Sequence, residues 1–274
     1  MNSFLNFEEK AKCISKSEPI KGTFGISEMF NQFEKFKKRE VNNRLIFRGV
    51  KNASFKMYSH AQRSWIENKP TEIYSNYLKN LIEKTKIWNN GVIPDYLKTY
   101  EKNFENNNLA YFSIMQHYEL PTPLIDFTYD PFVALYFACK DVVNCPLSND
   151  NDINNFFSVY FIYPNWLNSE YKIPKIKSLN LDDLGNNVYL IDEEVDLKNN
   201  IRIIAQKGLF IVNTSEDQDL ISCVRKNQID DHIFGCRDIH KSFANTILNT
   251  LSDMNINEET LFPDFNKLKH LLTD

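Results

Sequence analysis

Arginine, histidine, amide and carboxylate side chains gather in two short stretches of the sequence. The first is an apolar run ending in Arg48 and Gly49, and the second covers residues 115–131. Leu45 to Phe47 is typical of a buried strand, so we expect Arg48 at a strand exit, with Gly49 allowing a sharp backbone turn after it. An arginine held in this way is a fork for a carboxylate or a phosphate. The plain alternative is an ion pair inside the fold, which is the more common role of a lone arginine.

The second stretch adds side chains that could hold or act on a ligand, and two more come from elsewhere in the chain. These candidates are Gln116, His117, Tyr118, Glu119, Thr122 and Asp126, together with Arg63 and Gln206. Polar groups in such apolar surroundings must satisfy one another or a ligand. We therefore expect Arg48, His117 and Asp126 to reach the same cavity.

The order of the motifs resembles the FRG domain family. Phe47-Arg48-Gly49 is the tripeptide after which that family is named, and residues 55–63 resemble the segment that follows it. Residues 113–138 resemble the second family block, which contains a stretch close to Ala-Gln-His-Tyr-Gly. The third and closing blocks are similar to residues 202–210 and 261–264.

Four positions depart from the family pattern. Glu119 stands at the usual glycine and Pro123 at the usual arginine. Phe127 replaces the usual tryptophan, and Ser59 replaces a common proline. The change at position 123 removes one potential contact to an anion.

The Phe-Arg-Gly strand is similar to the arginine motif of the ADP-ribosyltransferase superfamily, which implies an enzyme that uses or destroys NAD. In such an enzyme an arginine grips the pyrophosphate, a histidine or aromatic ring packs on the nicotinamide, and a carboxylate stabilises the oxocarbenium-like transition state. The implied catalytic residues are Arg48, His117, Gln206 and Glu119. The implied NAD-binding residues are Arg48, Arg63, Gln116, Tyr118, Thr122 and Asp126. The setting of the family in bacterial and phage genomes implies a cytoplasmic toxin or phage-defence effector, whose macromolecular target the residues do not name.

The carboxylate that this chemistry needs is not fixed by the resemblance. The third block supplies Gln206, an amide, where such an enzyme normally offers glutamate. An amide can bind the ribose but carries no negative charge, so we expect a rate loss of about 10²-fold or more. Glu193 and Glu194 lie just upstream, and Glu119 lies beside His117, so each is a further candidate.

Two other interpretations compete with an enzyme. The same arginine pocket could serve a non-catalytic module that binds a nucleotide or a partner. Alternatively, the polar residues could form a structural network in which a buried Asp126 pairs with Arg48 or Arg63. A nuclease is disfavoured because the sequence has no clustered acidic metal site.

One spacing is typical of a metal site. His232, Cys236 and His240 recur at intervals of four, with Cys223 upstream, and on a continuous helix they could bind zinc. Gly235 and its apolar neighbours instead favour a strand and a turn, which would separate the three side chains. We therefore expect no metal.

Composition limits the class of protein. The chain has 274 residues, 42% hydrophobic and 14% aromatic, which suits one large domain with a substantial core. Its net charge of −4 gives no strong nucleic-acid signature. No run of apolar residues is long enough to span a membrane. The five cysteines are irregularly spaced, which is typical of reduced thiols in a cytoplasm.

Hydrophobic periodicity predicts the elements that must position these residues. Helices are expected over 27–40, 72–88, 94–105, 108–118, 238–251 and 264–272, with another beginning at Asp130-Pro131. Strands are expected over 44–48, 156–163 and 188–191, with a pair at 201–205 and 209–212. The predicted fold is a single α+β domain, with helices covering a small, mostly antiparallel central sheet, and an ADP-ribosyltransferase-like arrangement as a refinement. Residues 1–25 are predicted to be an N-terminal extension and 26–274 the FRG-like domain.

Overall fold

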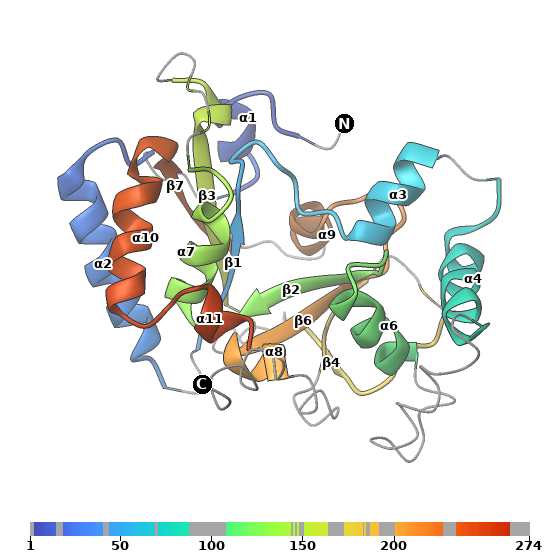
Figure 1. Ribbon diagram of the computed structural model, residues 1–274. Helices are drawn as coiled ribbons and strands as arrows, with labels where there is room; N and C mark the ends of the chain where they lie inside the picture. Colours follow the sequence, from blue (N-terminus) through green and yellow to red (C-terminus); the bar gives the residue numbers. More distant parts are fainter. Residues whose placement is uncertain are drawn as a thin grey trace, which may run out of the picture.

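The computed structural model places the chain around one mixed sheet with helices on both sides (Figure 1). It describes residues 3–14, 19–40, 44–68, 71–87, 108–143, 145, 147, 151–163, 173–182, 184, 187–191, 201–226 and 234–263. The helices expected over 94–105 and 264–272 lie outside these ranges, as do Glu193, Glu194 and His232. The side chain of His117 is likewise not described.

The sheet contains seven strands among the described residues, in the order β4-β5-β6-β2-β1-β3-β7. Their bounds are β1 Ile46–Val50, β2 Leu124–Thr128, β3 Phe156–Ile162, β4 Lys175–Ile176, β5 Val188–Ile191, β6 Gly208–Asn213 and β7 Phe234–His240. Every neighbouring pair is antiparallel except β4 with β5. The mostly antiparallel sheet is therefore confirmed.

The helices cover the sheet in separate groups. Their bounds are α1 Phe7–Ala11, α2 Thr23–Lys37, α3 His60–Asn68, α4 Tyr74–Ile87, α6 Asn108–His117, α7 Pro131–Cys139, α8 Ile201–Ala205, α9 Leu220–Lys226, α10 Ala244–Asp253 and α11 Glu258–Leu261. In Figure 1, α2, α7 and α10 lie on one side of β1 and β3, while α3, α4, α6 and α9 lie on the other side of the molecule. Within the described residues no helix combines the length and the apolar character needed to cross a lipid bilayer.

The sheet consists of two halves that meet over a very short contact. β1 pairs with β3 from Ile46 to Val50, and β2 pairs with β6 along its whole length. Between β1 and β2, however, the ladder contains one residue pair, Phe47 with Thr128. Figure 1 shows the consequence, since β1 and β3 run up the view while β2 and β6 run across it. The sheet therefore opens beyond Phe47, on the side that holds Arg48.

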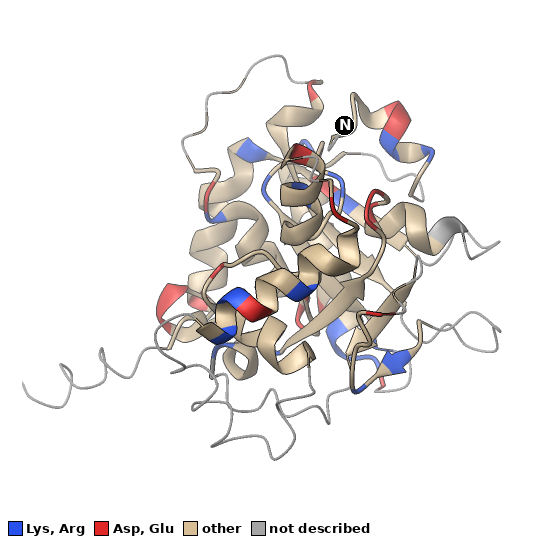
Figure 2. Cartoon of the chain, turned by 90° about the vertical axis from the view of Figure 1, so that its right-hand side faces the viewer, with Lys and Arg blue, Asp and Glu red and all other residues tan. Residues whose placement is uncertain are grey.

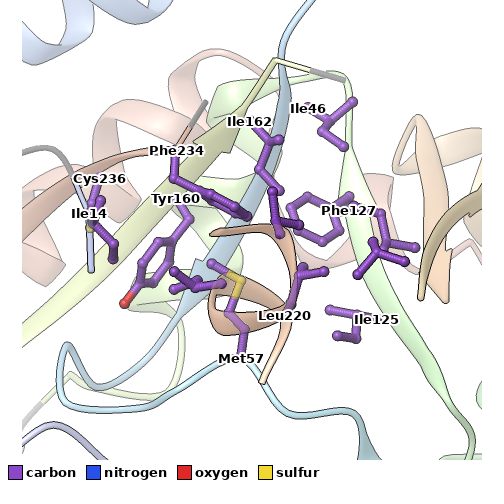
Figure 3. Packing of buried hydrophobic residues seen from close by; sticks show 14 of the residues in the cluster. Ile14, Ile46, Met57, Ile125, Phe127, Tyr160, Ile162, Leu220, Phe234 and Cys236 are labelled. Atoms are coloured by element: carbon purple, nitrogen blue, oxygen red, sulfur yellow. The ribbon is translucent and has the colours of Figure 1, made fainter. Parts of the chain in front are cut away.

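Separate apolar clusters hold these two halves in place. Figure 3 shows the cluster beneath the opening, where Ile46, Ile125 and Phe127 pack with residues of β3, β7 and α9. On the opposite face of β1, Phe47 packs with aromatic residues of α2 and α7. A third cluster joins α4 and α6 to β2 and β6. Because both faces of β1 are packed, the direction of the Arg48 side chain is fixed by its register in the strand.

Gly49 has a different role from the expected one. It does not follow the strand but lies within β1, and a Cβ atom at this position would lie 1.9 Å from the carbonyl oxygen of Ala134 in α7. The expected sharp turn is therefore wrong. Glycine is required because α7 packs directly on the backbone of β1.

Helix α7 begins as the sequence predicts. Asp130 precedes it, and its carboxylate accepts a hydrogen bond of 3.1 Å from the backbone nitrogen of Phe132. Pro131 occupies the first turn, where its missing N–H costs nothing. Asp130 is buried and also pairs with Lys37 and Lys207, so it ties α2 and the start of β6 to the beginning of α7.

The structure differs from the sequence-based prediction at three elements. Residues 201–205 form helix α8, because a short segment does not distinguish a helix from a strand. Residues 124–128 form strand β2, which the sequence analysis did not predict. The helix expected from residue 238 begins at Ala244, because residues up to His240 pair with β3.

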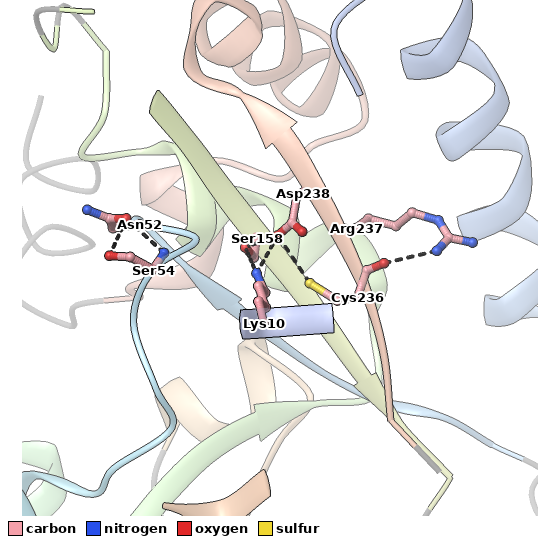
Figure 4. Close-up of polar contacts among 7 residues, drawn as sticks. All are labelled: Lys10, Asn52, Ser54, Ser158, Cys236, Arg237 and Asp238. Carbon is pink, nitrogen blue, oxygen red and sulfur yellow. Dashed lines mark hydrogen bonds and ion pairs between the residues drawn. The ribbon is translucent and has the colours of Figure 1, made fainter. Parts of the chain in front are cut away.

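The N-terminal residues are packed into the core. Phe4 and Ile14 are buried, and the ammonium group of Lys10 in α1 is buried against Asp238 and Ser158 (Figure 4). Lys10 Nζ also lies 4.8 Å from the ring centroid of Tyr160. The division of the chain at residue 25 remains a prediction, but α1 contributes to the same core as β3 and β7.

Candidate functional site

A cavity of about 790 Å³ opens where β1 and β2 separate. All five residues of β2 line it, together with parts of β1, α3, α7 and α8. Its volume lies within the range of about 300–1,000 Å³ that is usual for small-molecule sites. The opening in the sheet, rather than a loop, therefore provides the candidate site.

Arg48 lies at the centre of this opening. Its Nη1 atom donates a hydrogen bond of 2.7 Å to the backbone oxygen of Asp126, a residue that pairs with Phe210 of β6 but has no partner residue in β1. The side chain is 23% exposed. Burial lowers the pKa of Arg48, with a further lowering by Arg63 that Asp126 opposes, but a guanidinium stays charged at neutral pH. Arg48 is thus a fixed cation on the cavity wall, in mid-strand and not at the strand exit.

Asp126 is exposed in the cavity, contrary to the expectation that it is buried. Its side chain is 57% exposed because its position in β2 points toward the opening and not toward a packed layer. Oδ2 accepts a hydrogen bond of 2.7 Å from the Gln116 amide nitrogen and lies 3.8 Å from Arg48 Nη1. The predicted pairing of Asp126 with Arg48 is therefore present, but it faces solvent.

Gln116 and Thr122 orient the Asp126 carboxylate. The buried Thr122 hydroxyl donates to the Gln116 amide oxygen and accepts a hydrogen bond of 3.2 Å from the Leu124 backbone nitrogen. The Gln116 amide can then present only its nitrogen to Asp126. Thr122 supports the site from behind and is not among the described residues that line the cavity.

Glu119 lies at the end of α6 in a left-handed backbone conformation, with φ of 57°. The backbone nitrogen of Leu120 bonds to the Met115 oxygen, and that of Glu119 bonds to the Gln116 oxygen, at 2.9 and 3.1 Å. This is the Schellman arrangement, whose left-handed position usually holds glycine. The departure at Glu119 thus places a carboxylate on the cavity wall at a cost in backbone strain.

One face of α3 forms another wall, which the sequence analysis found only in part. His60, Arg63 and Glu67 all line the cavity, at spacings of three and four along the helix. Arg63 Nη1 donates a hydrogen bond of 2.8 Å to the Tyr58 backbone oxygen. Burial and the nearby Arg63 lower the pKa of His60, against the opposing effect of Glu67 and Glu119, so its imidazole is neutral at pH 7. The helical spacing from Arg63 was the signal that could have identified His60.

Gln206 lines the cavity from the turn after α8, where it acts as a connector. Its amide nitrogen donates a hydrogen bond of 3.0 Å to the Leu261 oxygen, and its backbone oxygen accepts one of 2.6 Å from Thr128. Gln206 therefore links α8, the end of α11 and β2. The hydrogen bond to Leu261 therefore engages the side-chain amide nitrogen of Gln206.

The last two candidates are the neighbouring residues Tyr118 and His117. Tyr118 is 61% exposed beyond the end of α6 and is not among the described lining residues. His117 ends α6, but its side chain lies outside the described part of the structure. The expectation that His117 reaches the cavity is thus not tested.

Of the four residues of the possible zinc spacing, two lie on a strand, Cys223 lies in α9, and His232 is outside the described residues. Cys236 and His240 both belong to β7, and Cys236 donates to Asp238 in the buried cluster around Lys10. Within the described residues no group of three histidine, cysteine or acidic side chains could hold a metal ion. Gly235 and its neighbours form the expected strand, which separates positions that a helix would have aligned.

Residues 43–144 match the family model of the FRG domain. The chain carries an FRG domain. The matched FRG segment includes Arg48, Arg63, Gln116, Glu119 and Asp126, so one family unit builds most of the cavity. No curated protein and no solved structure matched the chain. Gln206 and the cavity wall around α8 lie beyond the FRG match.

Proposed function

We propose that this FRG-domain protein cleaves NAD, as an ADP-ribosyltransferase or an NAD glycohydrolase, and acts as a toxin or phage-defence effector. The observation that carries the proposal is the shared cavity of Arg48 and Glu119. A guanidinium for the pyrophosphate and a carboxylate for the ribose line a space large enough for a dinucleotide.

Arg48 is suited to the pyrophosphate because its position is fixed before any ligand binds. One of its N–H groups is held by the Asp126 backbone oxygen, and a guanidinium has further donors in the same plane. The pairing with the exposed Asp126 carboxylate, at 3.8 Å, is weak enough to be exchanged for a phosphate oxygen.

Glu119 is the carboxylate that best suits the transition state. Asp126 is engaged by Gln116 and Arg48, and Gln206 is an amide bonded to Leu261. No hydrogen bond from a described residue reaches the Glu119 carboxylate. As the bond between the ribose C1′ and the nicotinamide nitrogen breaks, its electron pair leaves with nicotinamide, and Glu119 stabilises the positive charge left on the ribose.

His60 can accept the proton of the attacking group. Water or an acceptor hydroxyl forms the new bond to C1′ and must lose a proton, which a neutral imidazole accepts. His60 is half-buried on the α3 wall, where the Glu119 carboxylate acts to raise its pKa against the stronger lowering by burial. Both groups line the same cavity.

The competing proposal is a binding module that uses the same pocket without chemistry. It is favoured because the Asp126 carboxylate already accepts a hydrogen bond from Gln116, and because position 206 carries an amide and not a carboxylate. Both proposals require Arg48 for nucleotide binding, but only the enzyme requires Glu119 for turnover.

Nicotinamide release from NAD tests the proposal. We expect release by the wild-type chain and a loss of about 10²-fold or more in Glu119→Gln, with NAD binding retained. Arg39→Gln is the matched control, because Arg39 bonds to Tyr163 away from the cavity and should leave release unchanged. NAD binding without release by the wild-type chain would support the binding module instead.

A further inference from the structure

Two large apolar side chains on the cavity wall are exposed to solvent. Phe55 is 40% exposed and Leu120 is 38% exposed, and both line the cavity. The other large apolar side chains that are exposed in the described part of the chain lie outside the cavity lining. Apolar surface that stays open inside a pocket is typical of a place where part of a ligand packs.

The backbone at Phe55 is held in place although its ring is exposed. Phe55 forms an isolated β-bridge with Ser3, and the Phe4 nitrogen donates a hydrogen bond of 2.6 Å to the Ser54 oxygen. The Phe55 nitrogen donates a hydrogen bond of 3.1 Å to the Asn52 oxygen. The ring is therefore positioned before a ligand binds, so that little of the protein must become ordered on binding.

Phe55 lies beyond the free end of β1, on the side of the cavity that this strand forms. β1 continues for two residues past Arg48, about 7 Å, and ends at Val50. The following loop stays beside the start of β3, because the Ala53 nitrogen donates a hydrogen bond of 2.8 Å to the Phe156 oxygen. The loop that carries Phe55 thus extends the side of the opening on which Arg48 lies.

Leu120 belongs to the other side of the opening, formed by β2. It follows Glu119 at the end of α6, in the segment that leads into β2. The two strands separate beyond Phe47, and Arg48 connects them through its hydrogen bond to the Asp126 oxygen. The cavity therefore offers an exposed apolar side chain on each side of the arginine. A dinucleotide has a matching order, with a base on each side of its pyrophosphate.

We propose that the Phe55 ring stacks on the adenine of the dinucleotide. This inference rests on the proposed function, which places the pyrophosphate at Arg48 and the nicotinamide ribose at Glu119. Because Leu120 adjoins Glu119, the nicotinamide half occupies the β2 side, and the adenosine half occupies the β1 side, which leads to Phe55. The flat face of an aromatic ring is a favourable surface for a nucleobase.

Exposed rings also stack on the bases of single-stranded nucleic acid, but that ligand needs a basic groove along its backbone. Figure 2 shows basic and acidic positions interspersed over the face drawn, with no continuous basic stripe among the described residues. The carboxylates of Glu67, Glu119 and Asp126 also line the cavity. The cavity therefore suits one dinucleotide and not a polynucleotide.

Titration calorimetry with NAD and ADP-ribose tests this inference, in a Glu119→Gln background that keeps NAD intact. ADP-ribose contains the adenine and the pyrophosphate but no nicotinamide. We expect Phe55→Leu to weaken the binding of both ligands by the same factor, about tenfold or more. Phe55→Tyr, which keeps a ring face, should restore the affinity. Phe24→Leu is the matched control, because Phe24 is 81% exposed on α2, outside the described cavity lining, and should leave both affinities unchanged.

The kinetics of the protein that retains Glu119 give a second measurement. Phe55→Leu should raise KM for NAD by about tenfold or more and leave kcat unchanged, because the stacking is the same in the ground state and in the transition state. A distorted cavity would instead lower kcat, and that result would contradict the inference.

The possible failures are distinguishable. A loss of affinity for NAD alone would place Phe55 at the nicotinamide, and unchanged affinity for both ligands would remove the ring from the site. Either result overturns the adenine site and leaves the proposed function intact, as does NAD binding without ADP-ribose binding. Binding of neither ligand by the Glu119→Gln protein would overturn both proposals.

Proton NMR of NAD bound to the Glu119→Gln protein replaces these variants if Phe55→Leu does not fold. Stacking on Phe55 should shift the adenine ring protons upfield through the ring current. Adenine protons that do not shift, or an upfield shift confined to the nicotinamide protons, would contradict the inference.

Discussion

The backbone at Glu119 links stability to the proposed chemistry at a single residue. Its φ of 57° is the conformation that favours glycine, and the family pattern has glycine there. The sequence showed the departure, and the hydrogen bonds that end α6 show why this position favours glycine. Strain of this kind persists at functional positions because the side chain is needed.

Glu119→Gly should therefore stabilise the protein and inactivate it. We expect a gain of about 1 kcal/mol from relief of the left-handed strain, or a rise in melting temperature of about 2 °C. Nicotinamide release should fall by about 10²-fold or more. Calorimetric melting and the release assay on the same preparation check both parts. Full activity in a stabilised variant would show that the carboxylate has no catalytic role.

Asp126 shows where prediction at the residue scale failed. Its polarity within an apolar run suggested a buried ion pair, but the single-residue ladder between β1 and β2 leaves it exposed. The exposure of the Asp126 side chain depends on where β1 and β2 separate, and the local sequence pattern does not determine that position. Arg48 and Asp126 nevertheless line the same cavity, as expected, while the His117 side chain, the third member of that prediction, lies outside the described residues.

Asp126→Ala should lower the free energy of unfolding by less than about 1 kcal/mol, because the exposed ion pair of Asp126 with Arg48 contributes little to stability. Denaturant unfolding measures this value. A decrease of about 3 kcal/mol in the free energy of unfolding would instead support the buried ion-pair network that the sequence suggested.

At the scale of elements, the helices with clear apolar faces were predicted well. The start of α7 was predicted from Asp130 and Pro131, and α2, α4 and α6 lie close to their expected bounds. Strand β2 was missed because a polar residue at its centre interrupts the apolar run. Helix α8 was taken for a strand because a five-residue segment carries too little hydrophobic periodicity.

The close contact between α7 and β1 leaves no room for a side chain at Gly49. Gly49→Ala should destabilise the protein by about 3 kcal/mol or more, because the new Cβ would meet backbone atoms that cannot move alone. Gly22→Ala is the matched control, since nothing lies within 4 Å of a Cβ there. Equal stability of the two variants in urea would contradict the close packing of α7 on β1.

The buried cluster around Lys10 anchors α1 to β3 and β7. Burial alone lowers the pKa of Lys10, but Cys236, Tyr160 and Asp238 together raise it above its usual 10.5. A lysine whose pKa is raised on folding contributes its full stabilisation at pH values below its pKa in the unfolded chain. This stabilisation is lost as the pH rises through the pKa of the lysine in the folded protein.

Lys10→Ala should therefore destabilise the protein by about 3–5 kcal/mol, because it strands Asp238 in the core. The difference from wild type should stay constant between about pH 6 and about pH 9. Urea unfolding across this range is the measurement. A difference that disappears within the range would mean that Lys10 is not charged in the folded protein.

For the whole molecule, the account depends on a sheet whose two halves separate at Arg48. The α+β class and the mostly antiparallel sheet followed from the sequence, while the opening between β1 and β2 did not. That opening arises from tertiary packing, since separate apolar clusters fix the two halves in different directions. The part of the cavity wall that α8 contributes was missed for the same reason.

Arg48→Ala tests the central claim most directly, when NAD cleavage and the melting temperature are measured together. The account predicts loss of nicotinamide release with a destabilisation of only about 1–2 kcal/mol, because Arg48 gives up one hydrogen bond and an exposed ion pair. A folded Arg48→Ala protein that still releases nicotinamide at the wild-type rate would contradict the account.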